Sequence, residues 1–178
     1  YNGKEIKVLS RSKEILENIP SIKHLVIVSY PGSKISKEKL NFGRINVLEW
    51  KNILDKKEIN MRYELFEFNH PLAILYSSGT TGKPKCICHR SGGVLLQHLK
   101  ELNLHCNIVP NDKIFYFTTC GWMMWNWLVS SLAIGASIVL FDGFPMHKKD
   151  DLLIEIANKE EITLFGISAK YIDALRKN

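Results

Sequence analysis

The chain of 178 residues is long enough for one sizeable domain with its own hydrophobic core. An apolar content of 46% and a charged content of 24% are ordinary values for a globular protein. The net charge of +6 comes from lysines scattered along the chain, without a basic stripe interleaved with aromatic residues, and no apolar run reaches membrane-spanning length. We therefore expect neither nucleic-acid binding nor a membrane span.

The first part of the chain predicts a strand, a helix and a second strand. Residues 5–9 alternate polar and apolar side chains, as a strand does, and residues 12–19 have apolar side chains at helical spacing. Residues 25–28 form a β-branched apolar run, which is typical of a buried strand. We expect residues 1–35 to be a βαβ unit with a parallel pair of strands, at the end of one subdomain.

The next stretch, residues 36–70, is the least regular part of the sequence. It follows a Pro-Gly-Ser turn and carries exposed charged residues. Residues 49–54 fit one amphipathic helical turn with Trp50 and Ile53 facing inward. We interpret the stretch as a surface connector to the following strand.

Residues 71–178 predict a second α/β subdomain. It begins with an apolar run at 72–76, which indicates a buried strand, and a non-helical run at 86–89, so the segment between them is expected to join two strands. Further patterns predict helices at 94–106, 121–134, 149–158 and 169–176, and strands at 114–118, 137–141 and 162–166. This alternation predicts a parallel sheet with helices on both faces. The fold class is α/β, with portions of two mainly parallel sheets flanked by helices.

Three glycines in this part of the chain mark helix ends. Gly92 and Gly93 precede the helix at 94–106, where either a ligand facing the helix N-terminus or packing against the adjacent strand explains them. Gly135 follows the helix at 121–134 and is well suited to end it. That helix is apolar nearly all round, so we expect it to be buried on most sides.

The segment between the strands at 72–76 and 86–89 has the composition of a polyphosphate-binding loop. Glycine permits positive φ and close backbone approach, successive amides form a concavity that suits an anion, and the hydroxyls and lysines add donors and positive charge. The residues with this chemistry are Ser77, Ser78, Gly79, Thr80, Thr81, Gly82, Lys83 and Lys85. The loop differs from the common phosphate loop, because only two residues separate its glycines and a proline follows Lys83. A solvated Gly/Ser/Thr turn is the alternative interpretation.

The string at 76–85, Tyr-Ser-Ser-Gly-Thr-Thr-Gly-Lys-Pro-Lys, resembles the signature phosphate loop of the adenylate-forming enzymes, the AMP-forming acyl-CoA synthetases and their relatives. The resemblance continues through 89–93, 118–127, 135–136 and 141–143. Among the branches of this family, the longer string is most similar to the acetoacetyl-CoA synthetases. The run Gly-Trp-Met-Met-Trp-Asn-Trp at 121–127 is what points to that branch.

The resemblance implies an enzyme that joins acetoacetate to coenzyme A through an acyl-adenylate, using ATP and Mg²⁺. It implies that the loop holds the ATP phosphates, with Thr80 or Thr81 as a candidate Mg²⁺ contact. It also implies that Trp122, Met123 and Met124 line the acyl pocket, whereas we interpret the other two tryptophans of the run as packing residues. No residue is assigned as catalytic.

The family's Thr-Glu motif, ribose-binding Asp, hinge Arg and the Lys of its mobile C-terminal domain are not found in the sequence. Because the chain also opens on Tyr1, we expect an internal fragment of the large N-terminal domain that makes no acyl-CoA by itself. Two alternatives stay open. One is a synthetase for another short acid, such as acetate or propionate. The other is a non-enzymatic nucleotide-binding or scaffold fragment.

The four cysteines are too few to indicate a disulfide framework, and buried thiols in a reducing, cytoplasmic compartment fit better. Cys86, Cys88 and His89 could suggest zinc. A single residue separates the two cysteines, however, and no second ligand pair follows, which is unlike the usual zinc spacing. Nothing in the sequence indicates an oligomeric state.

Overall fold

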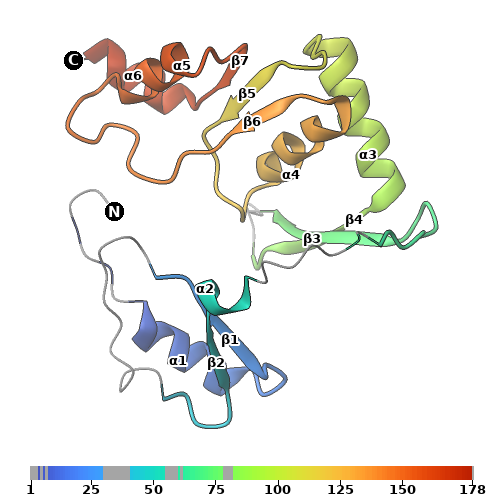
Figure 1. Cartoon of the computed structure of the whole chain (residues 1–178), viewed down its shortest axis with the longest axis vertical. Coiled ribbons are helices and arrows are strands. Elements are labelled where there is room, and N and C mark those ends of the chain that lie inside the picture. The colour runs from blue at the N-terminus through green and yellow to red at the C-terminus, as the bar shows by residue number, and fades with distance from the viewer. Residues whose placement is uncertain are drawn as a thin grey trace. The chain divides into compact units, whose positions relative to one another are not determined.

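A computed structural model of the protein describes residues 4, 6, 8–29, 41–54, 60, 62–77 and 82–177. The chain divides into two compact units between Tyr63 and Glu64 (Figure 1).

The first unit pairs two parallel strands beside a helix. Its elements are α1 (Leu9–Asn18), β1 (His24–Ile27), β2 (Asn46–Glu49) and α2 (Trp50–Ile53). The register of the sheet pairs His24 with Asn46 and Ile27 with Glu49. The buried side chains of Leu16, Ile27 and Ile45 form the core of this unit.

The side chain of Arg44 closes the end of α1. Its guanidinium donates hydrogen bonds to the carbonyl oxygens of Leu16 at 3.1 Å and Ile19 at 3.3 Å, and to that of Ile22 at 2.6 Å. The last carbonyls of a helix lack partners within the helix, so Arg44 satisfies groups that the fold would otherwise leave to water.

Three expectations for this unit differ from the structure. No strand is present at Ile6 or Val8, the described residues of 5–8, and Leu9 already belongs to α1. The parallel partner of β1 is instead β2, which lies inside the stretch expected to be a surface connector. Short alternating runs do not separate strand from helix by period alone, and β2 is recognisable only by its pairing. The turn at α2 is present, but Trp50 and Ile53 are exposed.

The second unit begins with an antiparallel hairpin of β3 (Pro71–Ser77) and β4 (Lys85–Arg90). The chain then forms α3 (Ser91–Lys100), which runs into a π-helical turn at Glu101–His105. The remaining elements are β5 (Lys113–Tyr116), α4 (Met123–Ser130), a 3₁₀ turn (Ser131–Ile134), β6 (Ser137–Val139), α5 (Leu152–Lys159), β7 (Leu164–Gly166) and α6 (Ala169–Lys177).

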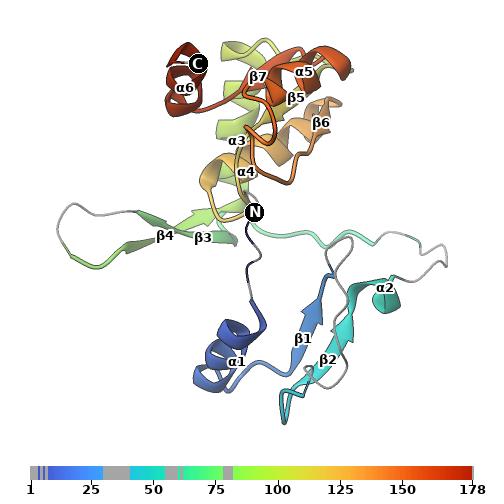
Figure 2. The same ribbon diagram turned by 90° about the vertical axis from the view of Figure 1, so that its left-hand side faces the viewer.

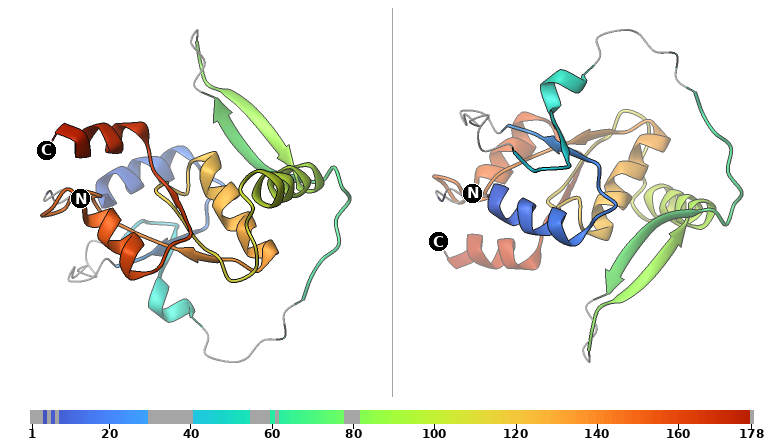
Figure 3. Two further views of the ribbon diagram at one scale, coloured as in Figure 1. Left: turned by 90° about the horizontal axis from the view of Figure 1, so that it is seen from above. Right: turned by 90° about the horizontal axis from the view of Figure 1, so that it is seen from below.

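Three of these strands form a parallel sheet in the order β6-β5-β7. Alternation along β5 sends successive side chains to opposite faces. Ile114 packs with buried residues of α4 and the π turn, namely Leu128 and Leu102, whereas Phe115 packs with Leu153 of α5 and Tyr171 of α6. Helices therefore cover both faces, as the sequence predicts (Figures 1 and 3).

The helix ends follow the glycines, although the burial differs from expectation. Gly135 adopts a left-handed φ of 85° at the end of the 3₁₀ turn, which confirms it as the stop. Along 121–134, however, Trp122, Met123 and Leu132 are exposed, so this stretch is buried on fewer sides than expected. Among the described residues, no helix is long and apolar enough to cross a membrane.

Candidate functional site

The predicted phosphate loop connects the two strands of the hairpin, as expected. Ser77 at the end of β3 pairs with Lys85 at the start of β4, so both ends of the loop are fixed by the sheet register. Ser78, Gly79, Thr80 and Thr81 lie outside the described residues.

The exit of the loop has the backbone that its glycine predicts. Gly82 adopts a φ of 109°, a conformation that L side chains rarely adopt, and no atom lies within 4 Å of where its Cβ would be. Lys83 follows it with an exposed side chain that forms no hydrogen bond or ion pair with the described part of the chain. Lys83 is therefore a cation without a partner among the described residues, beside a glycine-dependent turn, as expected of a phosphate site.

The hairpin is more exposed than its apolar sequence suggests. The side chains of Leu72, Ile74 and Tyr76 on β3 are all exposed, which corrects the expectation of a buried strand. The two strands project from the rest of the second unit (Figures 2 and 3). Because β4 passes directly into α3, the pair that carries the loop, Ser77 and Lys85, is at the outer end of this hairpin.

The N-terminus of α3 is bound by the segment just before the hairpin. The backbone N–H groups of Ser91 and Gly92 donate to the carbonyls of His70 and Phe68, each at 2.9 Å. The ring of Phe68 fills the place of a side chain at Gly92, since a Cβ there would lie 2.1 Å from its Cδ2 atom. Of the two explanations left open for Gly92, packing is the one that this geometry supports, although the partner is Phe68 rather than a strand.

The predicted acyl-pocket residues begin α4. Trp122 and Met123 have 66% and 45% of their surface exposed, and Met124 is half-buried. Met124 is a member of neither core cluster, whereas Trp125 and Trp127 pack against the cluster around Ile114. The interpretation of these two tryptophans as packing residues is therefore confirmed.

The parallel sheet brings the segment just past β5 next to the end of β7 at one edge. The N–H of Phe117, just past β5, donates to the carbonyl of Gly166 at the end of β7 at 2.9 Å. Trp122 and Met123 follow from the same edge. The residues that flank the phosphate loop, Ser77 and Lys85, pair at the end of the hairpin, and no backbone hydrogen bond between described residues joins them to Trp122.

One polar residue of this unit is missed by the sequence patterns. His98 on α3 is only 6% exposed, and its Nδ1 lies 2.8 Å from the Oγ of Ser130 on α4. Burial, and secondarily the nearby His89, lowers the pKa of His98, whereas Glu101 opposes the shift. The spacing of Val94, His98 and Leu102, four residues apart each time, is the signal that places His98 on the buried face.

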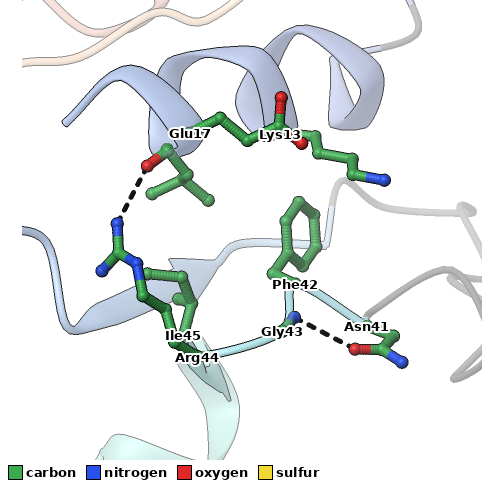
Figure 4. A pocket seen from close by; sticks show the side chains of 8 residues that line it. Lys13, Glu17, Asn41, Phe42, Gly43, Arg44 and Ile45 are labelled. Atoms are coloured by element: carbon green, nitrogen blue, oxygen red, sulfur yellow. Dashed lines mark hydrogen bonds between the residues drawn. The ribbon is translucent and has the colours of Figure 1, made fainter. Parts of the chain in front are cut away.

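A cavity of about 440 Å³ lies in the first unit and contains none of these candidate residues (Figure 4). It is lined by Lys13, Leu16, Glu17 and residues 41–45. Within the described ranges, no three His, Cys, Asp or Glu side chains lie close enough to hold a metal ion. Cys86 and Cys88 are exposed free thiols on β4, contrary to the expectation of buried thiols.

Comparison with known proteins defines the class of this chain. The family model described as AMP-binding enzyme matches residues 5–178, so the chain belongs to the AMP-binding enzyme family. The resemblance carried by the loop is thus confirmed.

Individual relatives show which members of this family the chain is similar to. The chain is 45% identical over 177 residues to the acetoacetyl-coenzyme A synthetase of Rhizobium meliloti (strain 1021), covering 99% of this chain and 27% of the relative. It is 38% identical over 197 residues to a malonamoyl-CoA synthetase of Penicillium aethiopicum, with coverages of 99% and 26%. The solved acetoacetyl-CoA synthetase from Streptomyces lividans matches the fold with a TM-score of 0.86 at 40% identity, over 99% of this chain and 26% of that one. The chain therefore spans about a quarter of the length of these relatives.

Proposed function

We propose that the 178 residues are part of a longer enzyme that ligates acetoacetate to coenzyme A with ATP, forming AMP and pyrophosphate. The observation that carries this proposal is the 45% identity, over 99% of the chain, to an acetoacetyl-coenzyme A synthetase. The chemistry of the loop and the run at 121–127 are further support. The proposal includes the domain limits at 35, 70 and 178, with a mobile C-terminal domain outside these residues.

The reaction has two steps. A carboxylate oxygen of acetoacetate attacks the α-phosphorus of ATP, the bond to the β-phosphate oxygen breaks, and acyl-adenylate and pyrophosphate form. The sulfur of coenzyme A then attacks the acyl carbon, its thiol proton is lost, and AMP leaves. A carboxylate is a weak nucleophile, so the first step depends on alignment and on stabilising the charge of the leaving pyrophosphate.

The loop supplies groups suited to that stabilisation. In this proposal, backbone amides and the hydroxyls of Ser77, Ser78, Thr80 and Thr81 hold the β- and γ-phosphates. Lys83, exposed at the exit of the loop and without a partner among the described residues, neutralises them. Lys85 adds charge at the start of β4.

Mg²⁺ is the metal that this chemistry calls for, because a bound Mg²⁺ would offset the negative charge of the phosphates. Mg²⁺ usually takes few protein ligands and completes its shell with water and substrate phosphates. A single hydroxyl, from Thr80 or Thr81, therefore fits as the contribution of this chain, since the described residues contain no group of three His, Cys, Asp or Glu that could hold a metal ion.

The acid is proposed to bind beside Trp122, Met123 and Met124. Their positions after β5 place them at the carboxyl edge of the parallel sheet, where open α/β folds bind ligands. Two of the three are exposed and the third is outside the core clusters, so none is needed to fill the core. We place the enzyme in the cytoplasm, with small-molecule substrates as its partners.

The test uses the purified full-length protein. Acetoacetate-dependent exchange of labelled pyrophosphate into ATP reports the first step, and formation of acetoacetyl-CoA reports both steps. Acetate, propionate and malonamate serve as competing acids. We expect the highest kcat/KM with acetoacetate. A higher kcat/KM for another acid would identify that acid as the substrate. ATP binding without pyrophosphate exchange for any acid would favour a non-enzymatic role.

Malonamate is a second candidate acid, because one relative is a malonamoyl-CoA synthetase at 38% identity. Acetoacetate and malonamate have the same length, and each carries a carbonyl two carbons from the carboxylate. They differ only in a terminal methyl or amino group. A pocket that accepts one excludes the other only through hydrogen bonding at that end, so the ratio of the two kcat/KM values decides between them.

A further inference from the structure

A buried hydrogen-bond chain connects α3 to α4. His98 of α3 contacts the Oγ of Ser130 through its Nδ1 at 2.8 Å, and that same Oγ donates to the backbone carbonyl of Asn126 at 2.9 Å. A carbonyl oxygen can only accept, so when both contacts form, the Ser130 hydroxyl donates to Asn126 and its Oγ accepts from His98. The Nδ1 atom of His98 therefore carries a proton, and the chain runs from His98 through Ser130 to Asn126.

This series of hydrogen bonds joins the two helices that carry the proposed halves of the site. The helix α3 begins at Ser91, immediately after β4 ends, so it is continuous with the hairpin that carries the phosphate loop. The helix α4 begins at Met123, directly after Trp122. Among hydrogen bonds between the described residues, the contact of His98 with Ser130 is the one that links side chains of these two helices.

The same hydrogen bonds also anchor the face of α4 that contains Met123, a residue of the proposed acid pocket. Met123, Asn126 and Ser130 are spaced three and four residues apart, which places them on one face of the helix. A shift or rotation of α4 about this contact would therefore move Met123 directly. Misplacement of a binding group by about 1 Å can reduce a rate by about a hundredfold.

We propose that His98 is a positioning residue that fixes α4, and with it Trp122, Met123 and Met124, relative to the hairpin bearing the phosphate loop. His98 acts through Ser130 and touches no substrate. This proposal rests on the proposed function, since it assigns the acid site to the first turn of α4.

The first test compares four variants of the full-length protein. His98→Leu removes the donor, Ser130→Ala removes the acceptor, and His98→Asn keeps an amide donor near the place of Nδ1. His105→Asn is the matched control, because His105 is an exposed histidine just beyond the same helix. We expect His98→Leu and Ser130→Ala each to lower kcat/KM for the acid about tenfold, with the KM for ATP changed less than about twofold. His98→Asn should restore most of the loss.

The coupling between the two residues gives a sharper outcome. The double variant His98→Leu/Ser130→Ala should lose no more acid kcat/KM than either single variant, since both remove the same contact. Additive losses would overturn the proposal. Equal reductions of kcat/KM for the acid and for ATP, without rescue by His98→Asn, would show that His98 is only structural.

A second readout does not depend on activity. Amide hydrogen exchange of residues 122–130 should speed up in His98→Leu and return to the wild-type rate in His98→Asn, while exchange in α5 stays unchanged. Unchanged exchange in 122–130 would overturn the positioning role even in an active enzyme. If the wild-type protein shows no acid-dependent pyrophosphate exchange, the proposed function is overturned. Amide hydrogen exchange would still decide whether His98 positions α4.

Discussion

Tyr116 and Gly166 face each other as register partners on β5 and β7, and the phenol ring of Tyr116 occupies the space beside Gly166. A Cβ at Gly166 would lie 2.2 Å from Cδ2 and 2.9 Å from Cγ of that ring. The ring also packs edge-on against Trp127, with 6.1 Å between the ring centroids. Tyr116 thus cannot swing aside without disturbing the packing of α4 on the sheet.

We predict that Gly166→Ala destabilises the protein, by about 1–3 kcal/mol, as expected for overpacking a filled site. Gly93→Ala is the matched control, because Gly93 lies in the first turn of α3 and no atom lies within 4 Å of where its Cβ would be. Alanine there should be neutral or stabilising, since it favours the helix. Urea unfolding of both variants measures the difference, and equal midpoints would contradict the packing argument.

The general plan of the second unit could be predicted because its signals are local and repeated. Apolar runs separated by turn residues identified β5, β6 and β7, and the alternation of strands with helices predicted a parallel sheet. The stop at Gly135 and the strands on both sides of the phosphate loop were also predicted correctly. Each of these follows from composition within a few residues.

The features that could not be predicted depend on contacts between distant parts of the chain. The strand β2 is recognisable only through its register with β1, across a separation that no local period records. His98 is buried because Ser130, on another helix, provides a partner for its ring. Exposure of Ile74 on the hairpin was missed because an apolar strand predicts burial but does not identify what covers it.

The phosphate role of Lys83 gives a prediction on activity. Lys83→Ala should lower the rate of acetoacetate-dependent pyrophosphate exchange by an amount equivalent to about 1.5–3 kcal/mol, which is typical for loss of a charge-assisted hydrogen bond. Its stability should hardly change, because the side chain is exposed and has no partner among the described residues. Lys170→Ala is the matched control, because it removes the same charge at an exposed position in α6. That variant should keep full activity. An unchanged exchange rate in Lys83→Ala would refute the phosphate role.

The lowered pKa of His98 predicts how stability depends on pH. Burial disfavours the imidazolium in the folded state, and His89 adds to this effect while Glu101 opposes it. Between the lowered pKa and the ordinary value of 6.5, the unfolded state binds more protons than the folded state. Stability from this group is therefore fully present above about pH 6.5 and decreases as the pH falls toward the folded pKa.

Comparison of wild type with His98→Asn isolates this contribution. Urea unfolding of both proteins from about pH 8 to about pH 5 should show the wild type losing stability more steeply on acidification. The His105→Asn variant corrects for loss of an exposed histidine. Parallel stability curves for wild type and His98→Asn would mean that the ring of His98 is not held neutral by burial.

The choice of acid is tested at Met124. This residue is the second of α4, is half-buried and belongs to neither core cluster, so a larger side chain there does not have to displace a core residue. Methionine is unbranched and adaptable, which suits a pocket for an acid with a second carbonyl. Met124→Trp should shorten that pocket and favour acetate over acetoacetate.

The expected change in the ratio of kcat/KM for acetoacetate over acetate is equivalent to about 1–3 kcal/mol, the usual range for one or two atoms in an apolar pocket. Leu132→Trp is the matched control, because it adds the same ring at an exposed position in the 3₁₀ turn that follows the same helix. That variant should leave the ratio unchanged. If the ratio also stays unchanged in a normally folded Met124→Trp protein, Met124 does not line the acid site, and other residues select the acid.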